Sequence, residues 1–234
     1  MVRDCIAIIP ARGGSKRIPG KNIIDFNGMP MIARTIRSAV HTGIFSRIVV
    51  STDDEKIADI SRKFGAEVPF FRTECCDDFS TVSQATIFAV KQAEEYYGES
   101  YNNVVQLMAN CPLRDASDII AAYDNFRQSD GNFQISCFKF GWMNPWWAMK
   151  LDEAFIPTKM FTETGEKRSQ DLPELYCPTG AIWIANVDAL KKCGTFYGDG
   201  YKAFPLDWKS AVDIDNYDDL EMALLLDNVC NAEN

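Results

Sequence analysis

The chain has 234 residues, of which 47% are hydrophobic and 24% charged, a length and composition typical of a globular protein with one large core. Its formal net charge of −9 at pH 7 argues against a surface that coats nucleic acid. No apolar run has the length of a signal peptide or of a membrane span, so we expect a cytoplasmic protein that contacts neither membranes nor nucleic acid.

Strand-like and helix-like segments alternate through the first two-thirds of the chain. The expected elements, in chain order, are a strand at Ile6–Ile9, a helix at Ile32–Val40, a strand at Arg47–Ser51, a helix at Asp54–Phe64 capped by Asp53 or Asp54, a helix at Thr81–Tyr97, a strand at Asn103–Leu107, a helix at Ser117–Phe126 and a strand at Gln134–Phe140. This alternation predicts βαβ units and a mainly parallel sheet. In such sheets ligands bind beyond the carboxyl ends of the strands.

The alternation breaks between Gly141 and Pro178, where tryptophans, phenylalanines and prolines occur without clear periodicity. We interpret this segment as a β-rich excursion that helps to form a homodimer, and the alternative is a set of loops packed on the parent core. A strand at Ala181–Ala185 and a helix at Tyr217–Val229 complete the chain. We therefore expect a core of residues 1–140 and 176–234 and an insertion of residues 141–175.

The cysteines and the histidine bear on metal and redox chemistry. None of the eight cysteines forms a Cys-x-x-Cys pair, and His41 is the only histidine. A zinc site is therefore not expected, and the thiols are best explained as reduced side chains of a cytoplasmic protein.

A basic, glycine-rich loop follows the first expected strand. Residues 11–22 have the sequence Ala-Arg-Gly-Gly-Ser-Lys-Arg-Ile-Pro-Gly-Lys-Asn, with four cations and three glycines. Backbone N–H groups of such a loop can point at an anion while the Arg and Lys side chains close around it. The loop is neither a P-loop nor a dinucleotide fingerprint, because Ser15 stands where each requires glycine. We predict a polyphosphate site here, and the alternative is a solvated basic loop.

An acidic pair, Asp213 and Asp215, follows an apolar run near the end of the chain. Residues two apart on an extended strand project to the same face, so both carboxylates can reach one cation. Mg²⁺ typically takes one or two carboxylates and completes its shell with waters and substrate phosphates. The alternative is that Asp215 caps the last helix while Asp213 is solvated.

Three further polar clusters each leave two interpretations open. Gln106 closes its strand and can contact a base or a sugar, or be satisfied by the backbone. Arg72 and the turn of residues 78–81, which includes Ser80, can contact a ligand or supply the cap of the following helix. The third cluster can bind a sugar acid or remain a solvated loop, and it consists of Arg168, Gln170 and Asp171.

Motifs along nearly the whole chain resemble the acylneuraminate cytidylyltransferases, the CMP-sialic acid synthetases. The first motif is highly specific, and the others follow in the family's order. The resemblance rests on residues 8–22, Val50–Asp54, Cys111–Arg114, Gln170–Pro173 and Asp213–Asp215.

The resemblance implies a Rossmann-like, GT-A-like nucleotidyltransferase fold, a homodimer, and Mg²⁺-dependent transfer of CMP from CTP to a nonulosonic acid, as in surface polysaccharide biosynthesis. It implies catalytic roles for Arg12, Lys16 and Lys21. It places the nucleotide on Ala11, Arg12, Ser15, Lys16, Asn22, Arg72 and Ser80, with Thr81 as an alternative to Ser80. It places the acid on Gln106, Arg168, Gln170 and Asp171, and the metal on Asp213 and Asp215.

Two departures from the family's pattern leave the acid open. The family often has Gln-Pro-Thr-Ser before Pro-Leu-Arg and Asn-Gly-Ala after Gln-Asp-Leu-Pro, whereas this chain has residues 106–111 and Thr179-Gly180-Ala181 there. The segment Arg168–Leu172 is more similar to the pseudaminic branch than to the sialic one. Two alternatives remain: a cytidylyltransferase for another acid, such as an eight-carbon ulosonic acid or a phosphonate, and a catalytically silent CTP-binding protein. The acidic pair argues against the silent protein.

Overall fold

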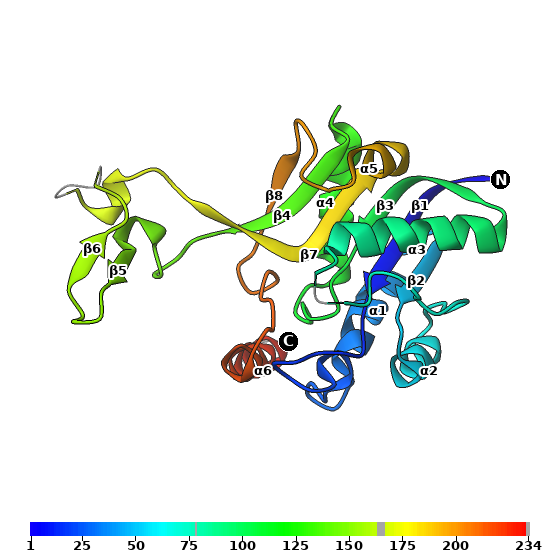
Figure 1. Cartoon of the computed structure of the whole chain (residues 1–234), viewed down its shortest axis with the longest axis horizontal. Coiled ribbons are helices and arrows are strands. Elements are labelled where there is room, and N and C mark those ends of the chain that lie inside the picture. The colour runs from blue at the N-terminus through cyan, green and yellow to red at the C-terminus, as the bar shows by residue number, and fades with distance from the viewer. Residues whose placement is uncertain (78, 163–166, 233–234) are drawn as a thin grey trace.

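The computed structural model describes residues 1–77, 79–162 and 167–232, without the side chains of Ser169 and of residues 230–232. The strands of its central sheet are β1 (Val2–Pro10), β2 (Arg47–Ser51), β3 (Ser100–Gln106), β4 (Phe133–Lys139), β7 (Tyr176–Asn186) and β8 (Lys202–Leu206). Their order is β2-β1-β3-β7-β4-β8, and β7 runs antiparallel to both neighbours whereas the other pairs are parallel (Figure 1). The predicted α/β fold with a mainly parallel sheet is therefore confirmed.

The helices are α1 (Met31–Thr42), α2 (Glu55–Lys63), α3 (Val82–Tyr97), α4 (Ala116–Gln128), α5 (Val187–Cys193) and α6 (Tyr217–Ala232). Asp54, and not Asp53, caps α2, because its carboxylate accepts the Ile57 N–H at 3.0 Å. Thr81 and Gln84 form a reciprocal capping box at the start of α3. Within the described ranges, no helix combines the length and the apolar composition that a bilayer crossing demands.

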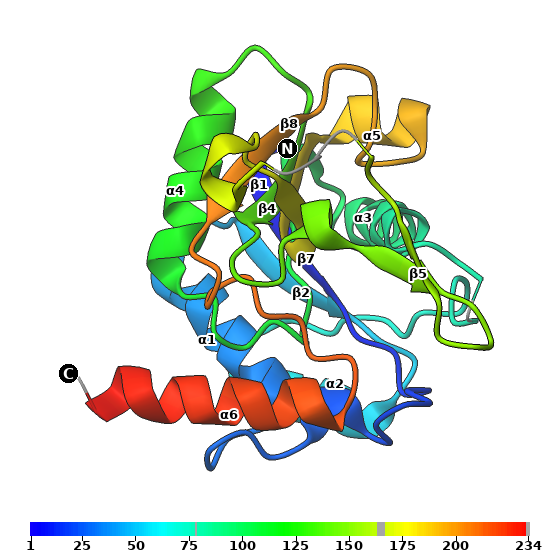
Figure 2. The same cartoon turned by 90° about the vertical axis from the view of Figure 1, so that its left-hand side faces the viewer.

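Helices cover both faces of the sheet and give the molecule three layers (Figure 2). Side chains of β1 alternate between these faces, and from Cys5 to Ile9 all of them are buried. Cys5, Ala7 and Ile9 share a core cluster with side chains of α1, α2 and α4. Ile6 and Ile8 belong to a second cluster with side chains of α3 and α5. The apolar run of the first strand is therefore that of a central strand buried on both sides.

Two elements of the structure, α5 and β8, were not predicted from the sequence. α5 has only 7 residues, too few for helical periodicity to stand out. β8 is an edge strand that contains Pro205 and is mostly exposed, so it lacks the apolar run of a buried strand. The strand expected at Ala181–Ala185 begins earlier, at Tyr176, and continues through Pro178 and Gly180, two residues that usually interrupt strands.

A third apolar cluster joins two parts of the chain that are far apart in sequence. Ile18 of the basic loop and Ile214 of the acidic pair are both fully buried in it. Phe26, together with Leu220 of α6, packs in the same cluster. This packing brings the basic loop and the acidic pair side by side.

A long extension, residues 141–175, leaves the sheet between β4 and β7, and we call it the arm. It carries a small separate sheet of β5 (Met149–Leu151) and β6 (Pro157–Lys159), away from the central sheet (Figure 1). Because β4 and β7 are antiparallel neighbours, the arm is the tip of a long hairpin and starts at the carboxyl end of β4. Its apolar side chains are unusually accessible, with Trp142 at 89% and Phe155 at 79% exposure. Exposed apolar surface of this kind is typical of a protein contact.

Candidate active site

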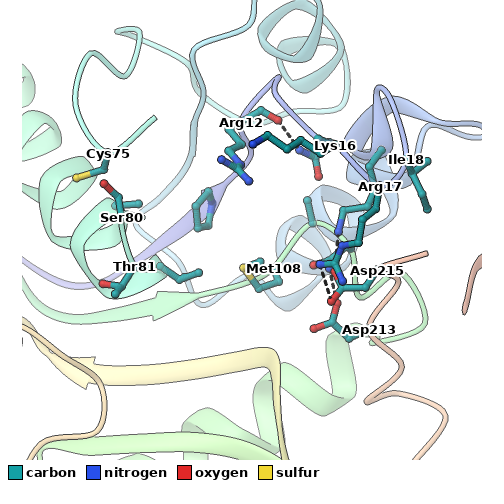
Figure 3. A pocket seen from close by; sticks show the side chains of 18 of the residues that line it. Arg12, Lys16, Arg17, Ile18, Cys75, Ser80, Thr81, Met108, Asp213 and Asp215 are labelled. Atoms are coloured by element: carbon teal, nitrogen blue, oxygen red, sulfur yellow. Dashed lines mark hydrogen bonds and ion pairs between the residues drawn. The ribbon is translucent and has the colours of Figure 1, made fainter. Parts of the chain in front are cut away.

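A cavity of about 530 Å³ opens at the carboxyl ends of β1 and β3. The chain passes from β1 to β2 on one side and returns with β3 on the other, so the cavity lies at the topological switch point of the sheet. Ser80 and Thr81 lie on one side of it and Asp213 and Asp215 on the other, with Met108 between them (Figure 3). Most of the residues predicted from the sequence line it, namely Arg12, Ser15, Lys16, Lys21, Asn22, Arg72, Ser80, Asp213 and Asp215.

Hydrogen bonds to Asp53 and Asn22 hold the backbone of the basic loop. Asp53 accepts the Gly13 N–H at 2.8 Å, and the buried Asn22 amide donates to the Arg12 carbonyl at 2.9 Å. A Cβ on Gly13 would lie 2.9 Å from an Asp54 carboxylate oxygen, so only glycine fits this close approach. These contacts fix the backbone at the start of the loop.

Lys21 and Arg17 both bind Asp215 on the same side of the cavity. Lys21 Nζ lies 3.0 Å from Asp215 Oδ1 and 2.9 Å from the Ile214 carbonyl oxygen. Arg17 Nη2 lies 3.0 Å from Asp215 Oδ2 (Figure 3). Asp215 thus carries two cationic partners in the ligand-free protein.

The acidic pair lies in an irregular segment and not in a strand, which corrects the geometry expected from the sequence. Both carboxylates still line the cavity, because Ile214 between them points into the third apolar cluster. The alternative role of Asp215 as a helix cap is wrong. Asn216 accepts the Asp219 N–H at 3.0 Å at the start of α6, and Asp219 accepts the Asn216 N–H at 3.0 Å.

Asp213 has the electrostatic character of a cation ligand. The protein atoms packed around its carboxyl group, together with the neighbouring charge of Asp215, raise the pKa of Asp213 to about 6. A bound cation would relieve this repulsion. Among the described residues no group of three or more His, Cys, Asp or Glu side chains is arranged so that it could hold a metal ion, so this chain would offer a metal two carboxylates. That donor set suits Mg²⁺ completed by phosphate oxygens.

The opposite side of the cavity contains Arg72, Cys75, Ser80 and Thr81. Arg72 is 4% exposed, and its Nε has no hydrogen-bond partner in the described structure. An unpartnered buried guanidinium N–H at a cavity is suited to an arriving acceptor. Ser80 Oγ donates to Asp77 at 2.8 Å, and Thr81 is occupied in the cap of α3. Asp78 of the predicted turn lies outside the described residues.

Several predicted residues do not line this cavity. The Ala11 side chain belongs to the core, and its N–H donates to the Ser51 carbonyl at 2.9 Å. Gln106 is fully buried, and its Nε2 lies 3.5 Å from the Gly180 carbonyl oxygen. The remaining three lie on the arm, away from the cavity of their own chain, and are Arg168, Gln170 and Asp171. Arg168 and Asp171 bind each other there, at 2.9 Å.

The floor of the cavity contains residues that the sequence analysis did not select. Met108 and Asn110 follow β3, and a Cβ on Gly180 would lie 2.9 Å from Met108 Cγ, so glycine makes room for Met108. Beneath them Arg114 is 1% exposed and donates to the Ala181 carbonyl at 2.6 Å. Burial lowers the pKa of Arg114 to about 10, so it remains a cation at neutral pH. The sequence drew attention to this segment through the motif Cys111–Arg114 and the departure at residues 106–111, but it assigned no role to Met108, Asn110 or Arg114.

Known proteins are similar to this chain along its length. A sequence model of the family described as Cytidylyltransferase matches residues 6–180. The pseudaminic acid cytidylyltransferase of Campylobacter jejuni strain 81-176 is 35% identical over 227 residues, which cover 94% of this chain and 95% of that protein. The CMP-N,N'-diacetyllegionaminic acid synthase of Legionella pneumophila is 32% identical over 224 residues, 90% of each chain.

Solved structures share the fold. The structure of a CMP:2-keto-3-deoxy-manno-octonic acid synthetase complexed with CTP superposes with a TM-score of 0.71 over 96% of this chain and 98% of that one. At 16% identity this likeness concerns the fold alone. The structural comparison thus agrees in fold with the family that the sequence comparisons show.

Proposed function

Because this chain belongs to the cytidylyltransferase family, we propose that it transfers CMP from CTP to a nonulosonic acid of the pseudaminic type and releases pyrophosphate. The observation that carries the proposal is the meeting of the basic loop and the acidic pair in one cavity at the switch point of the sheet. The Campylobacter relative, named for pseudaminic acid, supports this choice of acid, as does the segment Arg168–Leu172.

The cations of the basic loop would handle the charge of the triphosphate. In the proposed reaction the acid's anomeric hydroxyl oxygen forms a bond to the α-phosphorus of CTP, and the bond from that phosphorus to the bridging oxygen breaks. Arg12 and Lys16 would bind the triphosphate, and Lys21 would leave Asp215 to neutralise the departing pyrophosphate. The hydroxyl proton would pass to water, since no histidine is among the described residues that line the cavity.

Asp213 and Asp215 would hold a magnesium ion. When bound, Mg²⁺ would supply positive charge to the phosphate oxygens and orient them. For Asp215 to take part, its ion pairs with Arg17 and Lys21 must loosen, and the arriving phosphates offer both cations new partners. Asp213 forms no ion pair with the described residues, so it would not have to release a cationic partner before it bound the metal.

The arm supports the proposal of a homodimer. It starts at the carboxyl edge of the sheet, where the cavity also lies, and its aromatic side chains are exposed. In a dimer, the arm of one protomer would extend to the cavity of its partner. The acid in the partner's cavity would then be contacted by Arg168, Gln170 and Asp171. This would explain how they could bind the acid although they lie away from the cavity of their own chain.

Replacing Trp142 and Phe155 together by aspartate should convert the dimer to a monomer, because dimer formation would then bury two aspartate charges in place of two apolar side chains. Light scattering coupled to size exclusion measures the mass. CTP binding should persist while kcat/KM for the acid falls at least tenfold. The matched control is Trp208→Asp, because Trp208 is also exposed, at 48%, but lies outside the arm. This variant should remain dimeric. A monomeric native protein, or a fully active monomeric variant, would contradict the proposal.

Pyrophosphate release from CTP with a panel of acids tests the function directly. We expect release with a pseudaminic-type acid, slower release with legionaminic and neuraminic acids, and loss of release when Mg²⁺ is removed with EDTA. Release only with an eight-carbon ulosonic acid or a phosphonate would favour the alternative transferase. CTP binding without release under any condition would favour a silent binding protein.

The proposal places the reaction in the cytoplasm. Within the described side chains the cysteines are free thiols, as expected under reducing conditions. Burial raises the pKa of the Cys5 and Cys111 thiols well above its usual range, which keeps them protonated and unreactive.

A further inference from the structure

Asn110 makes an unusual set of contacts with the acidic pair. It lies after β3, is 3% exposed and lines the cavity. Its Nδ2 donates to Asp213 Oδ1 and, at 3.1 Å, to the Ile214 carbonyl oxygen. Its own backbone carbonyl accepts the Ile214 N–H at 2.9 Å. Asn110 thus forms hydrogen bonds with both the backbone and the carboxylate of residues 213–214, about a hundred positions later in the chain.

The four oxygens of the acidic pair differ in their partners. Asp215 Oδ1 binds Lys21 and Asp215 Oδ2 binds Arg17. Asp213 Oδ1 accepts from Asn110. For Asp213 Oδ2, the described part of the chain supplies neither a hydrogen bond nor an ion pair. This oxygen lies near Gly180, where an added Cβ would be 3.7 Å from it. Because Asp213 lines the cavity and Oδ2 is the one oxygen of the pair without a partner in the described structure, it is the carboxylate oxygen left for a ligand.

We infer that Asn110 is a positioning residue: its amide fixes Asp213 Oδ1 and so presents Asp213 Oδ2 to the divalent cation. The inference rests on the proposed function and deepens it, because it names the residue that orients the metal carboxylate. An amide serves this purpose better than a cation. It orients the carboxylate through a hydrogen bond and leaves the full negative charge of Asp213 for the metal.

Removal of the amide should loosen the carboxylate without dislodging the segment. In Asn110→Ala the backbone bond between residue 110 and Ile214 remains, and Ile214 stays buried in its apolar cluster. The substitution also removes Asn110 Oδ1, a buried acceptor without a hydrogen-bond partner, and this offsets part of the lost bonding. The main effect should fall on metal binding, where the loss of an orienting partner typically costs 10–100-fold in affinity.

The experiment measures Mn²⁺ binding to the full-length protein with CTP and no acid acceptor, by electron paramagnetic resonance. Asn110→Ala should weaken Mn²⁺ binding about ten- to a hundredfold, while CTP binding in EDTA changes less than twofold. In assays with acceptor, the Mg²⁺ concentration for half-maximal rate should rise by a similar factor, and kcat at saturating Mg²⁺ should largely recover. Asn110→Ser, which keeps a shorter donor, should fall between the native protein and Asn110→Ala.

Asn186→Ala provides the matched control. Asn186 also uses its amide at the end of a strand, where it caps α5 and donates to the Asn102 carbonyl at 3.2 Å. Its loss should lower thermal stability and leave Mn²⁺ affinity unchanged. Unchanged Mn²⁺ affinity in both Asn110 variants, or a parallel loss of CTP binding in EDTA, would overturn the inference. If the native protein itself binds no Mn²⁺ with CTP and releases no pyrophosphate, the proposed function fails instead.

Discussion

Lys21→Ala should lower turnover about a hundredfold or more while the protein stays folded. Lys21 Nζ and Arg17 Nη2 both lie 3.0 Å from an Asp215 carboxylate oxygen, but only the Lys21 side chain is largely buried, at 15% exposure. In such a site a donor aimed at developing charge is worth about 2.7–4 kcal/mol in the transition state, by analogy with oxyanion holes. Arg17 is 66% exposed and is less able to take over this role, because its charge is more strongly screened by solvent.

Single-turnover pyrophosphate release, with CTP and acid saturating, measures this effect, and thermal unfolding checks the fold. Lys191→Ala is the matched control: the Lys191 side chain is also mostly buried and is bound to a carboxylate, Glu94, at 2.6 Å, but it lies on α5 away from the cavity. Its loss should leave the rate within about twofold. A near-normal rate for Lys21→Ala would remove Lys21 from the mechanism and leave Arg12 and Lys16 as the candidates.

The fold was largely predictable because most of its elements carry local signals. Runs such as Arg47–Ser51 have the composition of strands buried on both faces, and caps such as Asp54 mark helix starts. The elements that were predicted poorly are those that lack such local signals. Pro178 and Gly180 interrupt the local pattern of β7, which is held by its two neighbours in the sheet and not by its own sequence.

The candidate site was predictable where chemistry is concentrated in a short segment, as in the basic loop. It was not predictable where the site depends on contacts between distant segments. Ile18 and Ile214 carry no functional signal, yet their shared cluster brings Arg17 to Asp215. Asn110 is a single polar residue in a loop, and only the structure shows that it donates a hydrogen bond to Asp213.

The arm shows a different limit of sequence reasoning. Its aromatic composition indicated an interaction surface, and the exposure of Trp142 agrees with that interpretation. The sequence did not reveal that Arg168 and Asp171 would lie away from the cavity of their own chain. A residue's chemical suitability for a sugar acid says nothing about which protomer's cavity it serves.

Asp213→Asn should change activity and stability in opposite directions, which separates a metal ligand from a structural residue. Asparagine keeps the size of the side chain and still offers a carbonyl oxygen to Asn110, but it removes the negative charge that Asp213 brings to the cavity. We expect turnover to fall by about a hundredfold or more, since a bound metal supplies several kcal/mol of charge stabilisation. Added Mg²⁺ should not restore it.

Stability should respond to pH in a defined way. The pKa of Asp213 is raised from its ordinary value of 3.8 to about 6 by burial and by Asp215, so the folded protein holds this proton more tightly than the unfolded chain. The charge of Asp213 therefore destabilises the ligand-free fold above pH 6, and its contribution vanishes below the unfolded pKa. In EDTA, Asp213→Asn should melt at or above the native temperature at pH 7.5 and match it near pH 3.5. Asp130→Asn, at an exposed carboxylate paired with Lys202, should alter neither turnover nor this pH dependence. A variant that loses activity and melts lower at pH 7.5 would mean that Asp213 supports the fold and is not primarily a metal ligand.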